Sequence, residues 1–346
     1  MIDFRYHLVS IVAVFLALAI GIVLGSTALQ GSTIDVLRHT SDSLQNQLNA
    51  ASAQRDSFEQ AADADSEFLQ TAEPKLLSGM LPDTKMLLVT EPGAPSSVIS
   101  GIQSAAKYAG ATITGTIALQ PKFNDLSGAT RADLSEINSR LAAPSGVVLT
   151  PATTDPKTAY QQEAAQLIAD AALERSANEP SLALADPQAL LKAYTDGGYL
   201  TYTGTPAARA TLAVVITAPA SASDGPGNPA DEVLLALAGQ FASFSAATLV
   251  AGPVMGSSLS NSPVSVLRNS SVSSQVSTVD NADKRVGQVA AVWALADQLQ
   301  GAKPRSYGVS GASAVSPVPS AVPSTTPAAT VTTPASKTGK GKVKKT

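Results

Sequence analysis

The run that decides the architecture of this chain is LVSIVAVFLALAIGIVLGSTAL, residues 8–29. It contains no charged residue, and a membrane-spanning helix needs about 20 consecutive apolar residues. A cleaved signal peptide is the alternative, because Ser26-Thr27-Ala28 offers a small-x-small cleavage site. The apolar run is longer than the usual signal core of about 7–15 residues, and Asp3 accompanies Arg5 in the leader. We therefore predict an uncleaved transmembrane helix.

The leader, residues 1–7, is too short to fold as a domain. Arg5 and the α-amino group favour the cytoplasmic side, because positive charges flanking a membrane helix stay inside. We therefore expect a single-pass protein of the cell membrane or envelope, with everything after Gly31 outside the cytoplasm.

Small residues recur at every fourth position of the predicted transmembrane helix, at Ala13, Ala17, Gly21 and Gly25. Such a ladder lets two helix backbones approach closely in lipid, where no hydrophobic force drives helices together. The alternative is that Ala and Gly are simply abundant in this chain. We predict self-association of the helix through these four positions.

Residues 32–73 form a second helical segment, which no Pro or Gly interrupts before Pro74. Every third or fourth residue from Ile34 to Ala72 falls on one seam, and most of these positions are apolar, above all Leu37, Leu44 and Leu48. A heptad seam of this kind needs a partner helix, most simply a second copy of the chain. We predict a coiled-coil stalk and a homodimer. The alternative is an amphipathic helix that packs on its own domain.

Residues 75–308 read as a globular domain, because short apolar runs alternate there with helical patterns. Two strand–helix–strand units of this kind favour a mostly parallel sheet with helices on both faces. We predict a three-layer α/β domain. The expected strands are 86–89, 111–119, 147–149, 212–216, 248–250 and 272–279. The expected helices are 96–108, 155–175, 187–194, 229–241 and 283–299.

The composition restricts the chemistry that the chain performs. There is no cysteine, and the two histidines, His7 and His39, lie in or before the predicted helical segments. Disulfides, cysteine-based zinc sites and Ser-His-Asp or Cys-His catalysis are therefore excluded. No Gly-rich phosphate-binding loop follows any predicted strand. We predict that the protein is not an enzyme.

The charge is divided between an acidic body and a basic tail, since no acidic residue follows Asp297. Nucleic acid binding by the folded part is therefore not expected. Residues 309–346 are rich in Ala, Pro, Thr, Ser and Lys and cannot bury a core, so we predict a disordered tail. Its basic end either contacts anionic polymers or headgroups, or only solubilises the chain.

Polar residues follow several of the predicted strands, and ligands of open parallel sheets bind beyond the carboxyl ends of strands. We single out Arg268, Asp280 and Asn281 as candidate crevice residues. The alternatives are that Asp280 only caps the helix near Asp283 and that Arg268 pairs with a surface carboxylate. The polar residues at these ends are Glu91, Arg268, Asn269, Thr278, Asp280 and Asn281.

No arrangement of metal ligands stands out, although Cys, Met and His are the residues that bind copper. Met80, Met86 and Met255 are isolated in the sequence, and His39 is exposed on the predicted stalk.

Four stretches together carry a family resemblance: MIDFRYHLVSIVAVFLALAIGIVLGS at residues 1–26, Gly252-Pro253, PVSVLR at 263–268 and VSTVDN at 276–281. Through them the chain, from Met1 to about Leu299, resembles the mycobacterial copper transport protein B family. The resemblance implies a membrane-anchored envelope protein in copper transport, efflux or homeostasis, with copper as the implied metal. It supplies no ligand motif to assign to residues of this sequence.

The alternative function is a non-enzymatic dimeric scaffold that binds and regulates another envelope protein. Some related members resemble regulators of a cell-wall hydrolase, and the predicted anchor and coiled coil both serve association. Both functions place the chain at the membrane. An envelope protein partner is expected, and a stoichiometric one would favour the scaffold, whereas the lack of one would favour copper transport.

Overall fold

The structure is a computed structural model that describes residues 4–145, 148–149, 156–174, 186–220, 227–254, 262–311, 314 and 316–317. The chain divides into two units, Met1–Phe68 and Leu69–Thr346. The predicted tail from residue 309 on lies largely outside the described residues, as does Met255.

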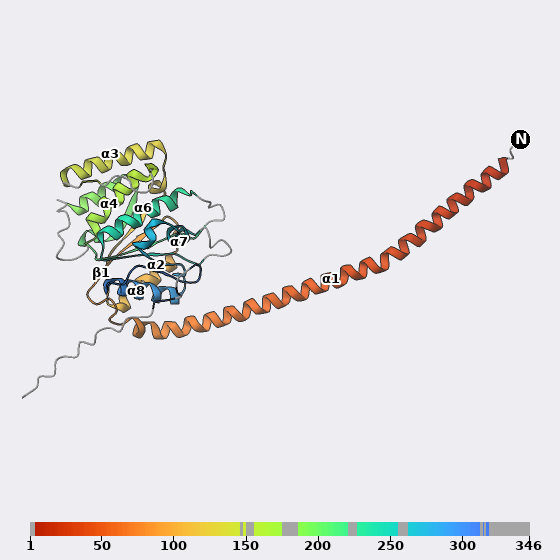
Figure 1. Ribbon diagram of the computed structural model, residues 1–346, viewed down its shortest axis with the longest axis horizontal. Coiled ribbons are helices and arrows are strands. Elements are labelled where there is room, and N and C mark those ends of the chain that lie inside the picture. The colour runs from red at the N-terminus through yellow and green to blue at the C-terminus, as the bar shows by residue number, and fades with distance from the viewer. Residues whose placement is uncertain are drawn as a thin grey trace, which may run out of the picture. The chain divides into compact units, whose positions relative to one another are not determined.

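One helix, α1 (Phe4–Leu77), contains both the predicted transmembrane segment and the predicted stalk (Figure 1). Its segment Tyr6–Ser26 is long and apolar enough to cross a membrane, with a mean hydropathy of 2.9. The helix does not stop at Pro74 as the proline predicts, but runs to Leu77. A proline leaves the backbone on its C-terminal side free to stay helical, and the fully buried Leu77 holds this last turn against the core.

The globular unit is built on a seven-stranded sheet in the order β3-β2-β1-β4-β5-β6-β7. All neighbouring strands run parallel except β3, which pairs antiparallel with β2 at one edge. The strands are β1 (Lys85–Thr90), β2 (Thr112–Leu119), β3 (Leu200–Gly204), β4 (Leu212–Ile216), β5 (Ala247–Ala251), β6 (Ser277–Val279) and β7 (Ser306–Tyr307). The central strands β1, β4 and β5 are buried along most of their length, as expected for a parallel sheet covered on both faces.

Helices cover both faces of the sheet, which confirms the predicted α/β class (Figure 1). One face carries α2 (Ser96–Ala109) and α8 (Arg285–Leu299), which pack against each other. On the other face α4 contacts α6, and α3 packs on α4. The helices of this second face are α3 (Gly128–Ser145), α4 (Ala159–Ala172), α5 (Pro187–Asp196), α6 (Pro229–Phe244) and α7 (Pro263–Arg268).

Short 3-10 helices complete the described elements: η1 (Pro121–Asn124), η2 (Pro156–Thr158), η3 (Pro206–Ala208) and η5 (Ser271–Ser274).

Several predicted elements differ from the observed ones. The predicted strand 272–279 is η5 followed by the much shorter β6, because Ser270 caps a 3-10 turn by accepting from the Val272 amide. Helix α3 and strand β3 were not predicted, since neither carries a clear apolar period. Of the predicted strand 147–149, the described residues Val148 and Leu149 are not in a strand, and residue 147 lies outside the described residues.

Candidate functional site

Four residues form a row at the carboxyl edge of the sheet, each one position beyond its strand. They are Glu91, Thr217, Gly252 and Asp280, which follow β1, β4, β5 and β6. Each donates its backbone N–H to the adjacent strand, at N···O distances of 2.8–3.3 Å. The last residues of the four strands are register partners of one another. Because side chains alternate between the two faces of a sheet, the four positions that follow all point to one face, the one that α6 and α7 cover.

The part of this row between β1 and β4 lies where the strand order reverses. From β1 the chain proceeds outward to β2 and β3, and it then returns to β4 and proceeds the other way to β7. Open parallel sheets bind ligands at such switch points. Glu91 and Thr217 occupy this position.

Glu91 is buried, with 8% of its surface exposed, and its Oε2 accepts a hydrogen bond of 3.0 Å from the Ala218 amide. Burial raises the pKa of this carboxyl group to about 8, against the opposing effect of the Ala218 hydrogen bond. The charge of Asp231, in the first turn of α6, raises the pKa further. Glu91 is therefore largely protonated at neutral pH.

Thr217 is fully buried beside Glu91, and its Oγ1 has no hydrogen-bond partner among the described residues. It lies against Gly252, where an added Cβ would come within 2.6 Å of this oxygen. Since Val264 closes the same space, the row is tightly packed on the β5 side.

Replacing Glu91 with Gln should make the stability of the globular unit less dependent on pH. In the unfolded chain the carboxyl group has its ordinary pKa of 4.5, whereas in the folded protein its pKa is about 8. The wild type should therefore lose stability as pH rises through this window, by at most about 1.4 kcal/mol per pH unit, and then level off. Glu91→Gln keeps an acceptor for the Ala218 amide and should remove this slope.

Urea denaturation at intervals between pH 5 and 9 measures the effect. Glu136→Gln, on an exposed part of α3, controls for the loss of one negative charge. If the free energy of unfolding changes with pH in the same way for the wild type and Glu91→Gln, the assignment of a buried neutral carboxyl group is contradicted.

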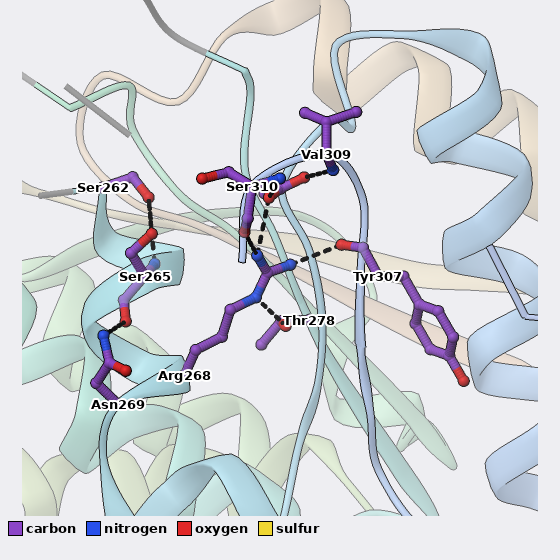
Figure 2. A network of polar contacts seen from close by, with 9 residues as sticks. Ser262, Ser265, Arg268, Asn269, Thr278, Tyr307, Val309 and Ser310 are labelled. Atoms are coloured by element: carbon purple, nitrogen blue, oxygen red, sulfur yellow. Dashed lines mark hydrogen bonds and ion pairs between the residues drawn. The ribbon is translucent and has the colours of Figure 1, made fainter. Parts of the chain in front are cut away.

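At the other end of the row, Arg268 and Asp280 form a buried ion pair of 2.8 Å, with side-chain exposures of 7% and 5%. Figure 2 shows the guanidinium group of Arg268, at the end of α7, surrounded by oxygen acceptors. Its Nε donates to Thr278 Oγ1 at 2.8 Å and its Nη2 to the Tyr307 carbonyl at 2.6 Å. Nη1 donates to Asp280 and also to the carbonyl of Ser310.

The Asp280 carboxylate accepts two further hydrogen bonds, which come from the segment after β7. The backbone amides of Val309 and Ser310 donate to its Oδ1 and Oδ2, each at 2.8 Å. Gly308 lies so close to this carboxylate that an added Cβ would overlap Oδ1. We call Arg268, Thr278, Asp280 and the backbone of residues 307–310 the C-terminal latch, because together they hold β7 and the turn after it.

The contacts of Arg268 and Asp280 match neither of the two alternatives given for these predicted crevice residues. Asp280 does not cap a helix. Helix α8 begins at Arg285, its N-cap residue is Lys284, and no side chain caps this end of the helix. Arg268 pairs with a carboxylate that is buried rather than on the surface. Asn281 is not part of the latch and packs against Gly287 instead.

The arrangement suits structural support better than catalysis, because the polar atoms of the latch form hydrogen bonds and an ion pair with one another. Of the other predicted residues, Thr278 belongs to the latch and accepts from Arg268. Asn269 lies outside the latch and donates to the Ser265 carbonyl within α7. Residues that the sequence did not reveal are Thr217 and Asp231, because an isolated Thr and a helix N-terminal Asp are common everywhere.

Metal ligands do not converge in the part of the chain that the structure describes: no group of three or more His, Cys, Asp and Glu side chains is placed to hold a metal ion. Met86 is fully buried in the core within β1, and Met80 is half-buried against the same core. His39 lies on α1, in the other unit. The described residues therefore do not fit a tight copper site.

The predicted association surfaces lie along α1. Leu37, Leu44 and Leu48 of the seam are 54–63% exposed, and the small-residue ladder from Ala13 to Gly25 lies in the apolar segment. In contrast, the seam positions Leu69 and Ala72 are half-buried within the globular unit. The free part of the seam therefore ends before Leu69.

Comparison with known proteins gives a consistent result over nearly the whole chain. The family model described as "Copper transport outer membrane protein, MctB" matches residues 1–319. A protein of Mycobacterium tuberculosis named "Copper transporter MctB" is 29% identical over 315 residues, which cover 89% of this chain and 96% of the relative. A protein of the same name from Mycobacterium leprae is 29% identical over 316 residues, with the same coverage.

Proposed function

The chain belongs to the MctB family, and from this membership we propose that it takes part in copper transport or copper homeostasis at the cell envelope. The observation that carries the proposal is the family match over residues 1–319, supported by relatives that are named copper transporters. These names favour copper transport over the alternative role of a regulatory scaffold. We propose a non-enzymatic role, in keeping with the description of the family.

The way in which the chain handles copper follows from its architecture. One apolar helix cannot enclose a pore, and the described residues of the globular unit bring no copper ligands together. We therefore propose that the protein works as an anchored component of an envelope assembly, in which copies of the chain or other envelope proteins complete the path of the metal.

Deletion of the gene in its native host tests this function. We expect cell-associated copper, measured by mass spectrometry, to rise during growth in added copper, and wild-type complementation to restore it. Zinc and manganese contents serve as controls. Unchanged copper content and unchanged copper tolerance after deletion would refute a role in copper homeostasis.

We also propose a single-pass topology with the globular unit outside the cytoplasm, supported by the segment Tyr6–Ser26 and by Arg5 before it. Because the chain has no cysteine, a single introduced one labels a unique site. Ser43→Cys and Lys303→Cys should react with a membrane-impermeant maleimide on intact cells. Asp3→Cys should react only after permeabilisation. Protection of the two distal sites would reverse the proposed orientation.

The exposed seam of α1 supports a further proposal, a parallel homodimer through residues 37–65. Leu44 and Leu48 are 54% and 62% exposed, and apolar side chains at heptad spacing are stabilised by a partner helix. A fragment that begins at Ser32 should sediment as a dimer. Changing both leucines to Asp should give monomers that keep the circular dichroism of the globular unit.

The matched control places the same charges away from the seam, at Asn46 and Ala53, which lie on the opposite side of the heptad. This variant should remain dimeric. A monomeric wild-type fragment would refute the coiled-coil stalk.

A further inference from the structure

The last turns of α1 are built into the globular unit, although the rest of the helix belongs to the other unit. Glu73 is 1% exposed, and its Oε2 pairs with Nη1 of Arg285 at 3.1 Å. Its Oε1 is buried and has no partner among the described residues. Leu77, one turn later, is fully buried in the core that α2 and α8 form with the sheet. The ion pair of Glu73 and the burial of Leu77 thus hold the end of α1.

Arg285 is the first residue of α8, and this first turn is fixed at its other side to the segment after β6. The Lys284 amide donates to the Asn281 carbonyl at 3.0 Å, and Gln288 Nε2 donates to the Ala282 carbonyl at 3.1 Å. Gly287 packs so closely on Asn281 that any Cβ at this position would overlap the Asn281 carbonyl oxygen. A displacement of Arg285 therefore also displaces Asn281, because there is no space between α8 and Asn281.

Asn281 directly follows Asp280, whose carboxylate binds Arg268 and the amides of Val309 and Ser310. A continuous series of contacts thus runs from Glu73 through the first turn of α8 to the C-terminal latch. Glu73, Asn281 and Asp280 are buried, Arg285 between them is half-buried, and Gly287 packs closely on Asn281. Packed contacts of this kind transmit displacement rather than deform.

We propose that the first turn of α8 couples the end of α1 to the C-terminal latch, so that a change in the seating of α1 alters how firmly residues 307–310 are held. The same linkage acts in reverse, because coupling between two sites is reciprocal. Since α1 continues without a break from Phe4 to Leu77, this linkage joins the helix that contains the apolar segment to β7 and the turn after it. The proposal does not depend on a role in copper transport.

Hydrogen exchange of the full-length protein in detergent tests the coupling. Arg285→Ala removes the partner of Glu73, and Glu73→Gln removes the charge while it keeps the shape of the side chain. Both variants should speed exchange of the Val309 and Ser310 amides by about fivefold or more, in the range typical of allosteric coupling. In the reverse direction, Asp280→Asn should speed exchange in residues 73–81.

Arg131→Ala is the matched control, because Arg131 is also a half-buried arginine but lies on α3, on the opposite face of the sheet. It should leave exchange at residues 307–310 unchanged. The proposal is overturned if the effect of Arg285→Ala and Glu73→Gln stays within residues 69–77 and 283–288, or if Arg131→Ala changes the latch equally. Should Arg285→Ala fail to fold, Glu73→Gln alone decides between these outcomes.

Discussion

Replacing Arg268 with Met should lower the free energy of unfolding of the globular unit by about 3–5 kcal/mol, the usual cost of breaking a buried ion pair at one partner. Met retains much of the aliphatic volume, so the loss reports the guanidinium group. That group satisfies four acceptors from two segments, residues 278–280 and 307–310, and its removal leaves the buried Asp280 carboxylate with only two backbone amides. Arg268→Lys should cost less, because an ammonium group keeps the charge but not the planar fork.

Urea denaturation of the full chain measures this loss. Lys192→Met is the control, since Lys192 forms an exposed ion pair with Asp196 on α5, where an exposed pair contributes about 0.5 kcal/mol or less. The double variant Arg268→Met/Asp280→Asn should be less damaging than the sum of the single changes, because the two side chains share one network. Equal effects of Arg268→Met and Lys192→Met would show that the latch contributes little to stability.

The globular unit, residues 69–346, should bind Cu(I) with an affinity several orders of magnitude below that of dedicated copper sites. Tight binding of this soft ion needs two or more convergent thiolates, thioethers or imidazoles. The unit has no cysteine, no histidine and three methionines. One of these, Met86, is fully buried in the core, and Met80 is half-buried.

A competition titration against a chromogenic Cu(I) chelator measures this affinity. A positive control introduces Lys192→His and Asp196→His, whose side chains meet one helical turn apart on exposed α5. This variant should bind copper more tightly than the wild type. One tight Cu(I) per wild-type chain would contradict the prediction, and Met80 and Met255 would then be the first residues to replace.

These two predictions bear differently on function. The first concerns how the fold is held, and it stands whether or not the protein handles copper. The second separates two ways of handling copper: if binding is weak while gene deletion still changes copper content, the assembly rather than the isolated chain provides the metal path.

The sequence was sufficient wherever one local property decides the structure. The uncharged run of residues 8–29 predicts a helix long enough for a membrane because length and apolarity alone set that requirement. The apolar runs at 86–89 and 212–216 are buried on both faces, and continuous apolar runs of this length are typical of central parallel strands. The α/β class followed from these runs and the helices between them.

The sequence was insufficient where the outcome depends on residues distant in the chain. Strand β3 follows α5 and pairs antiparallel with β2, and its alternately exposed residues gave no strong strand pattern. The sequence leaves open whether Asp280 lines a crevice or caps the helix near Asp283, because its neighbours in sequence are compatible with both roles. Its actual partners, Arg268, Val309 and Ser310, lie 12 to 30 positions away.

By itself, the sequence determined the apolar helix, the heptad spacing of the seam, the α/β class and the set of polar residues at the carboxyl ends of the strands, because each is a matter of residue type and spacing. Only the tertiary structure decided what those polar residues do. It buried Glu91 beside Thr217, paired Arg268 with Asp280, and placed Glu73 of α1 against Arg285. The physical reason is that a charged side chain acquires its role from its partners and its burial, and the folding of distant segments onto one sheet edge sets both.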